Sequence, residues 1–299
     1  MERKDLKRLA AAVILLGLLV SMAAGYLLLR RPRGRPSPAA DERLTVVATL
    51  PLFAGLVERI GGREVRVVSI VRGGICAHEY EPTPRDMERL AGAALFVKAG
   101  AGLDPWADGL LAGLGGRKPF PLDASAGVLP AEERGAGSHY WGDPEKAARA
   151  AENILKGLCA VRPRSKDLFR RNYEAFRAEL IRTATTLRAE AARLGKKELV
   201  SYSAAFSPFF AYFGFANLAT VEEAHEEEVS ARRLMEVARL VRERGIRVVV
   251  GEASDPRPAK ALAEETGARL VILWPATDPT GDYLHTLRRN VALLCEGFR

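Results

Sequence analysis

The sequence predicts an α/β protein with two parallel-sheet lobes joined by a long connecting helix, preceded by an N-terminal transmembrane helix. Three observations support this prediction. Strand-like runs rich in β-branched residues alternate with helical stretches from Leu44 onward, as expected for parallel sheets covered on both faces. One long amphipathic segment interrupts the alternation. An uninterrupted apolar run opens the chain.

The apolar run extends from Leu9 to Leu29, and its 21 residues span about 31 Å as a helix, which matches a hydrocarbon core of about 30 Å. Lys and Arg flank both ends, so their distribution does not set an orientation. Ser21–Ala23 could serve as a signal-peptide cleavage site, but the apolar run continues beyond it. We therefore expect an uncleaved single-pass anchor over residues 1–43, with a cleaved signal as the alternative. The segment holds no cysteine for a lipid, and the Pro-rich stretch Arg30–Ala40 reads as a linker.

Charge and cysteine content exclude two classes of protein. The net charge is +8, but residues 1–43 hold nine Lys/Arg and four Asp/Glu, so this segment alone contributes +5 and the other residues only +3. No basic face with interleaved aromatic residues follows, which argues against nucleic-acid binding. The three cysteines cannot all pair within one chain, so the protein is not a disulfide scaffold.

Residues 44–162 form the first predicted lobe. β-branched runs bounded by turn signals predict its strands, and helical periodicity between them predicts the helices that cover the sheet. Strands are expected at Arg43–Leu50, Glu64–Val71 and Ala94–Gly100, with a candidate fourth at Pro119–Leu122, and helices near Pro51–Ile60, Pro84–Ala91 and Asp104–Ala112 and from about Pro144.

Residues 163–195 form the predicted connecting helix. Phe169 and Phe176 repeat at seven residues, and a second apolar series continues the same stripe to Leu194. Pro163 suits a first-turn position and Gly195 a helix stop. Thirty-two residues would extend about 48 Å, long enough to pass both lobes.

Residues 196–299 repeat the strand–helix scheme and form the second predicted lobe. Strands are expected at Lys197–Ser203, Phe215–Val221, Ile246–Glu252 and Ala268–Trp274, and helices near Phe206–Phe213, Ser230–Arg244, Pro258–Thr266 and Gly281–Glu296.

Ligands of open parallel sheets bind at the carboxyl ends of the strands, and two histidines lie in loops expected there: His78 follows the second strand and His139 precedes the helix from about Pro144. His78 lies in the Pro-rich loop "GGICAHEYEPTPRDMERL" and His139 in "GSHYWGDPEKA". Imidazole and carboxylate are common ligands of zinc and similar ions. A single such histidine is more often incidental, but two of them suggest a metal site. His225 lies in an acidic run that suits a solvated loop, and His285 is expected at the surface of the last helix.

The chain resembles the solute-binding proteins of metal-ion ABC transporters of the zinc/manganese class. The resemblance covers about Leu44–Phe298 and is most specific in "HEYEPTPRDMERLAGAALFVKAGAGLDPWADGLL", "HYWGDPEKAARAAENI", "LAEETGARLVILWP" and "GDYLHTLRRN". It implies two α/β lobes joined by a long helix, with a metal held in a cleft between them and delivered to a membrane permease.

Carried over by position, the resemblance assigns His78 and His139 as the first two metal ligands. It departs at the other two positions, where this chain has Ser203 and Trp274. Serine is a weak ligand and tryptophan cannot bind these ions. Glu252, at the end of the neighbouring strand, is one replacement, although it could instead pair with Arg257 or cap the helix that follows.

Asp278, four residues beyond Trp274, is the second replacement, and Cys76, Glu79 and His225 are further candidates. The two imidazoles favour zinc over manganese as the transported ion.

The prediction is thus an extracytoplasmic, membrane-anchored, monomeric binding component of a metal-ion ABC importer, working with a permease. One alternative is a degenerate relative that acts as a binding or adaptor protein without tight metal binding. An enzyme is not expected, because the sequence has no HExxH-type motif and no nucleophile–base pair stands out by spacing.

Overall fold

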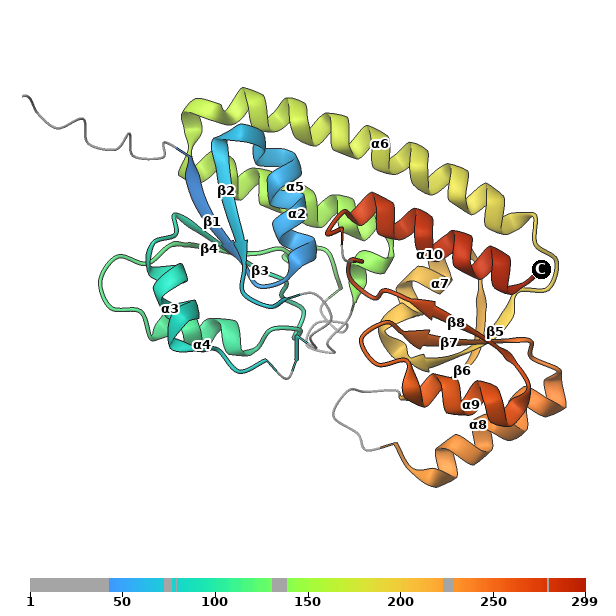
Figure 1. Ribbon diagram of the computed structural model, residues 1–299. Coiled ribbons are helices and arrows are strands. Elements are labelled where there is room, and N and C mark those ends of the chain that lie inside the picture. Colours follow the sequence, from blue (N-terminus) through green and yellow to red (C-terminus); the bar gives the residue numbers. More distant parts are fainter. Residues whose placement is uncertain (1–42, 73–76, 79, 131–138, 223–228, 279) are drawn as a thin grey trace, which may run out of the picture. The chain divides into compact units, whose positions relative to one another are not determined.

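The structure is a computed structural model that describes residues 43–299, apart from residues 73–76, 79, 131–138, 223–228 and 279 (Figure 1). The predicted transmembrane helix lies outside the described residues. Within them, no helix is long and apolar enough to cross a membrane. Arg43–Arg299 form one compact unit.

The first lobe contains a four-stranded parallel sheet in the order β2-β1-β3-β4. The central strands β1 and β3 are buried on both faces, which explains their nearly continuous apolar sequence. All four strands, including the short fourth one, form where the sequence predicts them. The elements are β1 (Leu44–Ala48), α2 (Pro51–Gly61), β2 (Val65–Ser69), α3 (Pro84–Ala91), β3 (Leu95–Lys98), α4 (Trp106–Ala112), β4 (Phe120–Asp123) and α5 (Pro144–Val161).

The second lobe repeats this arrangement with the order β6-β5-β7-β8, again all parallel. Its four strands also confirm the sequence prediction. The elements are β5 (Glu198–Ser203), α7 (Ser207–Phe213), β6 (Ala216–Glu222), α8 (Ala231–Arg244), β7 (Val248–Glu252), α9 (Arg257–Thr266), β8 (Arg269–Leu273) and α10 (Tyr283–Gly297).

The connecting helix α6 (Lys166–Ala192) is shorter than predicted at its start. Residues Pro163–Ser165 form a separate 3₁₀ turn, because Ser165 (φ −103°, ψ 9°) lies outside the α-helical region and separates this turn from α6. The 27 residues of α6 therefore extend about 40 Å. Its buried stripe contains the predicted Phe169 and Phe176.

The helix α6 packs on both lobes, against α2 and α5 of the first and α7 and α10 of the second (Figure 1). One cluster of buried apolar side chains also includes residues of both lobes, such as Phe53 and Leu284. The lobes therefore share a core as well as a helix. Loops at the carboxyl ends of their strands carry the candidate ligands.

Candidate metal site

His78 lies in a short loop that is fixed on both sides by side chains of the first lobe. The indole Nε1 of Trp106 donates to the carbonyl oxygen of the preceding residue, Ala77, at 2.8 Å. The ring of Tyr80 lies 5.1 Å from that of Trp106, and its hydroxyl donates to the carboxylate of Asp86 at 2.8 Å. These contacts leave the His78 backbone little freedom.

The helix that follows this loop, α3, provides the carboxylate of Asp86 that holds the loop in place. One oxygen of Asp86 also accepts from the backbone N–H of Thr83 at 3.0 Å and from its hydroxyl at 2.6 Å, so the carboxylate holds the start of α3. Burial alone would raise the pKa of Asp86, but these hydrogen bonds together hold that pKa below its ordinary value. The polar residues of the loop therefore fix its conformation through hydrogen bonds and do not only contact solvent.

His139 lies immediately before a 3₁₀ turn, Tyr140–Gly142, that leads into α5. Its carbonyl oxygen accepts from the N–H of Gly142 at 2.9 Å. Asp143 then caps α5, with its carboxylate accepting from the N–H of Glu145 at 2.8 Å. The side chains of Tyr140 and Trp141 in the turn are almost completely buried.

The structure brings the two histidines together. Their ring centroids are 5.9 Å apart, with the ring planes inclined at 53°. A zinc ion lies roughly 2.1 Å from a coordinating imidazole nitrogen, so two histidines on one tetrahedral ion have ring centres roughly 5 Å apart. Small rotations of the two side chains would bring them from the observed separation to that geometry.

Glu252 ends β7 and has one carboxylate oxygen without a hydrogen bond. Its Oε2 accepts from the hydroxyl of Ser254 at 2.8 Å. Its Oε1 is buried and contacts no hydrogen-bond donor among the described residues. Arg257 pairs with Asp255 through two contacts of 2.8 Å, so it does not neutralise Glu252. A buried oxygen of this kind is costly unless a ligand satisfies it.

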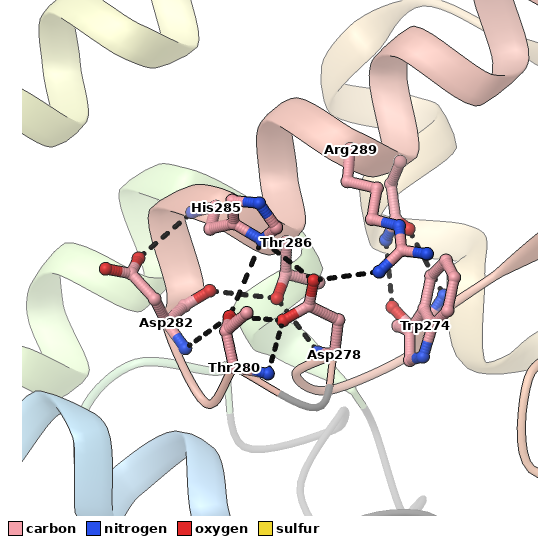
Figure 2. Close-up of polar contacts among 8 residues, drawn as sticks. Trp274, Asp278, Thr280, Asp282, His285, Thr286 and Arg289 are labelled. Carbon is pink, nitrogen blue, oxygen red and sulfur yellow. Dashed lines mark hydrogen bonds and ion pairs between the residues drawn. The ribbon is translucent and has the colours of Figure 1, made fainter.

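Asp278 is buried, and protein groups already satisfy its carboxylate (Figure 2). The backbone N–H of Thr280 donates to it at 3.0 Å, and the Thr280 hydroxyl also donates. Arg289 Nη1 donates at 3.2 Å, and His285 Nδ1 lies 2.8 Å away. Burial alone would raise the pKa of Asp278, but these donors hold that pKa below its ordinary value.

His285 therefore has a structural contact that the sequence did not indicate. Its side chain is about half exposed, as expected for a surface residue of the last helix. Its ring nevertheless helps to fix Asp278 at the start of α10.

Ser203 and Trp274, which stand where the family resemblance expects ligands, have local partners. The Ser203 hydroxyl is buried and accepts from the N–H of Ala205 at 3.2 Å. The backbone of Trp274 is held by the side-chain amide of Asn290, which accepts at 3.2 Å and donates at 2.9 Å. The guanidinium of Arg289 lies 3.9 Å from the centre of the Trp274 ring (Figure 2). This stack places a positive charge where a metal ligand was expected.

The candidate ligands do not all converge. Within the part of the chain that the structure describes, no three side chains of the His, Cys, Asp and Glu types lie close enough together to hold a metal ion. The histidine pair is thus assembled, whereas Glu252 and Asp278 are not grouped with it. Cys76, Glu79 and His225 lie outside the described residues.

Sequence reasoning missed two tryptophans that support the histidines. Trp106 fixes the loop of His78, as described above, and the ring of Trp141 makes an edge contact with that of His139 at 5.1 Å between centroids. The nearness of Trp141 to His139 in the chain was an available signal. Trp106 is 28 residues from His78, and nothing in the sequence pattern connects the two.

Comparison with known proteins identifies the family. The sequence profile of ZnuA, the periplasmic component A of a zinc-uptake complex, matches residues 46–297. The chain is 26% identical over 276 residues to the iron-binding protein YfeA of Yersinia pestis, and the match covers 88% of each protein. It is 25% identical over 263 residues to the manganese ABC transporter substrate-binding lipoprotein PsaA of Streptococcus pneumoniae, covering 83% of this chain and 85% of that protein.

A crystal structure of ZnuA has the same fold, with a TM-score of 0.77, 25% sequence identity, and coverage of 85% of this chain and 98% of the other. The family match extends over nearly all of the described residues, so the chain belongs to the ZnuA family, whose members are solute-binding proteins of metal ABC transporters and not enzymes. The names of its relatives refer to zinc, iron and manganese, so the comparisons do not establish which metal this chain prefers.

Proposed function

We propose that this protein binds a divalent transition-metal ion outside the cytoplasm and delivers it to the permease of an ABC importer. The observation that supports this most directly is the 5.9 Å approach of the His78 and His139 rings, which come from separate loops of one lobe. Two neutral imidazoles at this separation suit one ion better than two unrelated structural roles. Family membership supports the same proposal.

Glu252 is the proposed third ligand. Its buried Oε1 has no donor among the described residues, and a bound cation would satisfy it. Because the described side chains form no group of three ligands, this assignment requires Glu252 or the histidine loops to move when the ion binds. Asp278 stays the second candidate, but it would first have to release Arg289 and His285.

Zinc is the proposed cargo, with manganese and iron as competitors. Two imidazoles and one carboxylate suit zinc, whereas manganese prefers more oxygen ligands. The relatives named for iron and manganese make this preference a question for direct competition.

The attachment to the membrane is proposed from the sequence. The Leu9–Leu29 segment is long enough for a single-pass anchor and carries no cysteine, whereas PsaA is named as a lipoprotein. We expect a monomer whose residues 43–299 face away from the cytoplasm.

The test is elemental analysis of protein purified without a metal-binding tag, followed by titration of the stripped protein with zinc and with manganese. About one equivalent of tightly bound zinc is expected. A protein that neither retains nor rebinds any of these ions would contradict the proposal. It would favour a second candidate function, that of a binding or adaptor protein that does not bind metal tightly. The Arg289 guanidinium over Trp274 is the observation that favours this second candidate.

A further inference from the structure

The turn that carries His139 is attached to the second lobe by two hydrogen bonds at Trp141. The indole Nε1 of Trp141 donates to the carbonyl oxygen of Pro275 at 2.7 Å. The backbone carbonyl of Trp141 accepts from the hydroxyl of Tyr283 at 2.6 Å. Pro275 follows Trp274 and Tyr283 begins α10, so both partners belong to the second lobe.

The bond from Tyr283 is buried, the bond to Pro275 is partly buried, and the side chain of Trp141 is tightly packed. Trp141 is 1% exposed and its ring also makes an edge contact with that of Phe53, at 5.5 Å between centroids. Burial raises the pKa of Tyr283 well above its ordinary value, so its hydroxyl stays a neutral donor at any working pH. At Gly142 the turn lies so close to α7 that an added Cβ would be 3.0 Å from the backbone nitrogen of Phe209.

The ring of His139 contacts the ring of Trp141. The two rings are inclined at 64°, with centroids 5.1 Å apart. Because Trp141 is held through both its side chain and its backbone, the second lobe sets the orientation of the ring that contacts His139. A displacement of Pro275 or of the start of α10 would therefore be transmitted to the imidazole through one intervening side chain.

We propose that Trp141 is a positioning residue for the metal ligand His139, and that Tyr283 and Pro275, which are not ligands themselves, hold Trp141 in place from the second lobe. The proposal rests on the proposed function, in which His139 binds the ion. It accounts for a site in which Ser203 and Trp274 supply no ligand from that lobe. A site with few ligands depends on how well each of them is oriented before the ion arrives, and residues behind the ligands provide that orientation.

Tyr283→Phe tests the proposal by deleting one hydroxyl. The matched control is Tyr140→Phe, which deletes a buried hydroxyl from the same turn. The Tyr140 hydroxyl donates to the carbonyl of Ala99 at 2.9 Å, within the first lobe. Zinc affinity and the melting temperature of the metal-free protein are measured for both variants and for His139→Ala. The NMR shifts of the His139 ring are measured for the wild type and for the two tyrosine variants. The ring shifts report the orientation of His139 directly.

Tyr283→Phe is expected to weaken zinc binding about tenfold and to move the His139 ring resonances, whereas Tyr140→Phe lowers the melting temperature and changes affinity less than twofold. If His139→Ala weakens binding but Tyr283→Phe leaves affinity within twofold and the His139 resonances in place, the positioning role is refuted and the proposed function stands. If His139→Ala has no effect, the proposed function fails and this proposal fails with it. Should Tyr283→Phe not fold, Trp141→Phe removes the bond to Pro275 and is judged by the same criteria.

Discussion

Replacing Asp278 by Asn tests whether its carboxylate stabilises the fold or binds the metal ion. Asn keeps the size of the side chain and can still accept from the Thr280 N–H, but it loses the charge that Arg289 and His285 contact in Figure 2. A hydrogen bond to a charged group contributes about 1.5–3 kcal/mol when buried, and exposure reduces that contribution. The side chains of Arg289 and His285 are 43% and 51% exposed. We therefore expect Asp278→Asn to lower the free energy of unfolding by about 2 kcal/mol.

The pH dependence of this loss follows from the lowered pKa of Asp278. The folded protein holds the Asp278 proton less readily than the unfolded chain does, so the stabilisation is complete above the unfolded pKa of about 3.9. It is lost as the pH falls through the lower folded pKa. The difference in unfolding free energy between wild type and Asp278→Asn should therefore be largest near neutral pH and should shrink below about pH 4.

Urea unfolding of residues 43–299, followed by circular dichroism between pH 3 and pH 8, measures this difference, and calorimetric titration measures zinc affinity in the same samples. We expect lower stability with affinity changed less than twofold. Unchanged stability together with a loss of affinity greater than tenfold would refute the structural reasoning and make Asp278 a ligand.

Three further predictions concern the ligands and the anchor. His78→Ala and His139→Ala should each weaken zinc binding at least tenfold, about 1.4 kcal/mol, by calorimetry, with His285→Ala as the control that retains affinity; a variant of His78 or His139 with wild-type affinity would remove that residue from the site. Glu252→Gln should weaken zinc binding more than tenfold while the melting temperature of the metal-free protein stays nearly constant. A shifted melting temperature with constant zinc affinity in this variant would make Glu252 structural. Ser203→His should tighten zinc binding by adding an imidazole. The full chain should stay in the membrane fraction through salt and carbonate washes, and recovery of a soluble chain that begins near Ala24 would show that the apolar run is a cleaved signal.

The fold was predictable because its signals are local. Most strands are short runs with β-branched residues, and the strands at the centre of each sheet bury most of their apolar side chains. The spacing of Phe169 and Phe176 alone indicated the buried face of α6. The start of α6 was less predictable. Pro163 suits both a 3₁₀ turn and the first turn of an α-helix, and the backbone conformation of Ser165, which separates the two, has no signal in the sequence.

The candidate site was only partly predictable because most of its contacts join residues far apart in the chain. The two histidines were found because each lies in a loop of the first lobe beside a Pro-rich turn. The hydrogen bonds of Trp141 to Pro275 and Tyr283 cross 134 and 142 residues, and no pattern of residue types anticipates them. The same holds for Asp278, whose position suggested a ligand but whose contacts with Arg289 and His285 appear only when α10 is in place.

X-ray absorption spectroscopy at the zinc edge, on tag-free protein loaded with one equivalent of zinc, tests most directly whether His78 and His139 bind one ion. Imidazole rings give a characteristic outer-shell scattering pattern, so the number of histidines on the ion can be counted. The wild-type protein should show two imidazoles at about 2.0–2.1 Å with oxygen completing the shell, and His78→Ala should show one. A shell made of oxygen alone in the wild-type protein, or an imidazole count that His78→Ala does not change, would contradict the account.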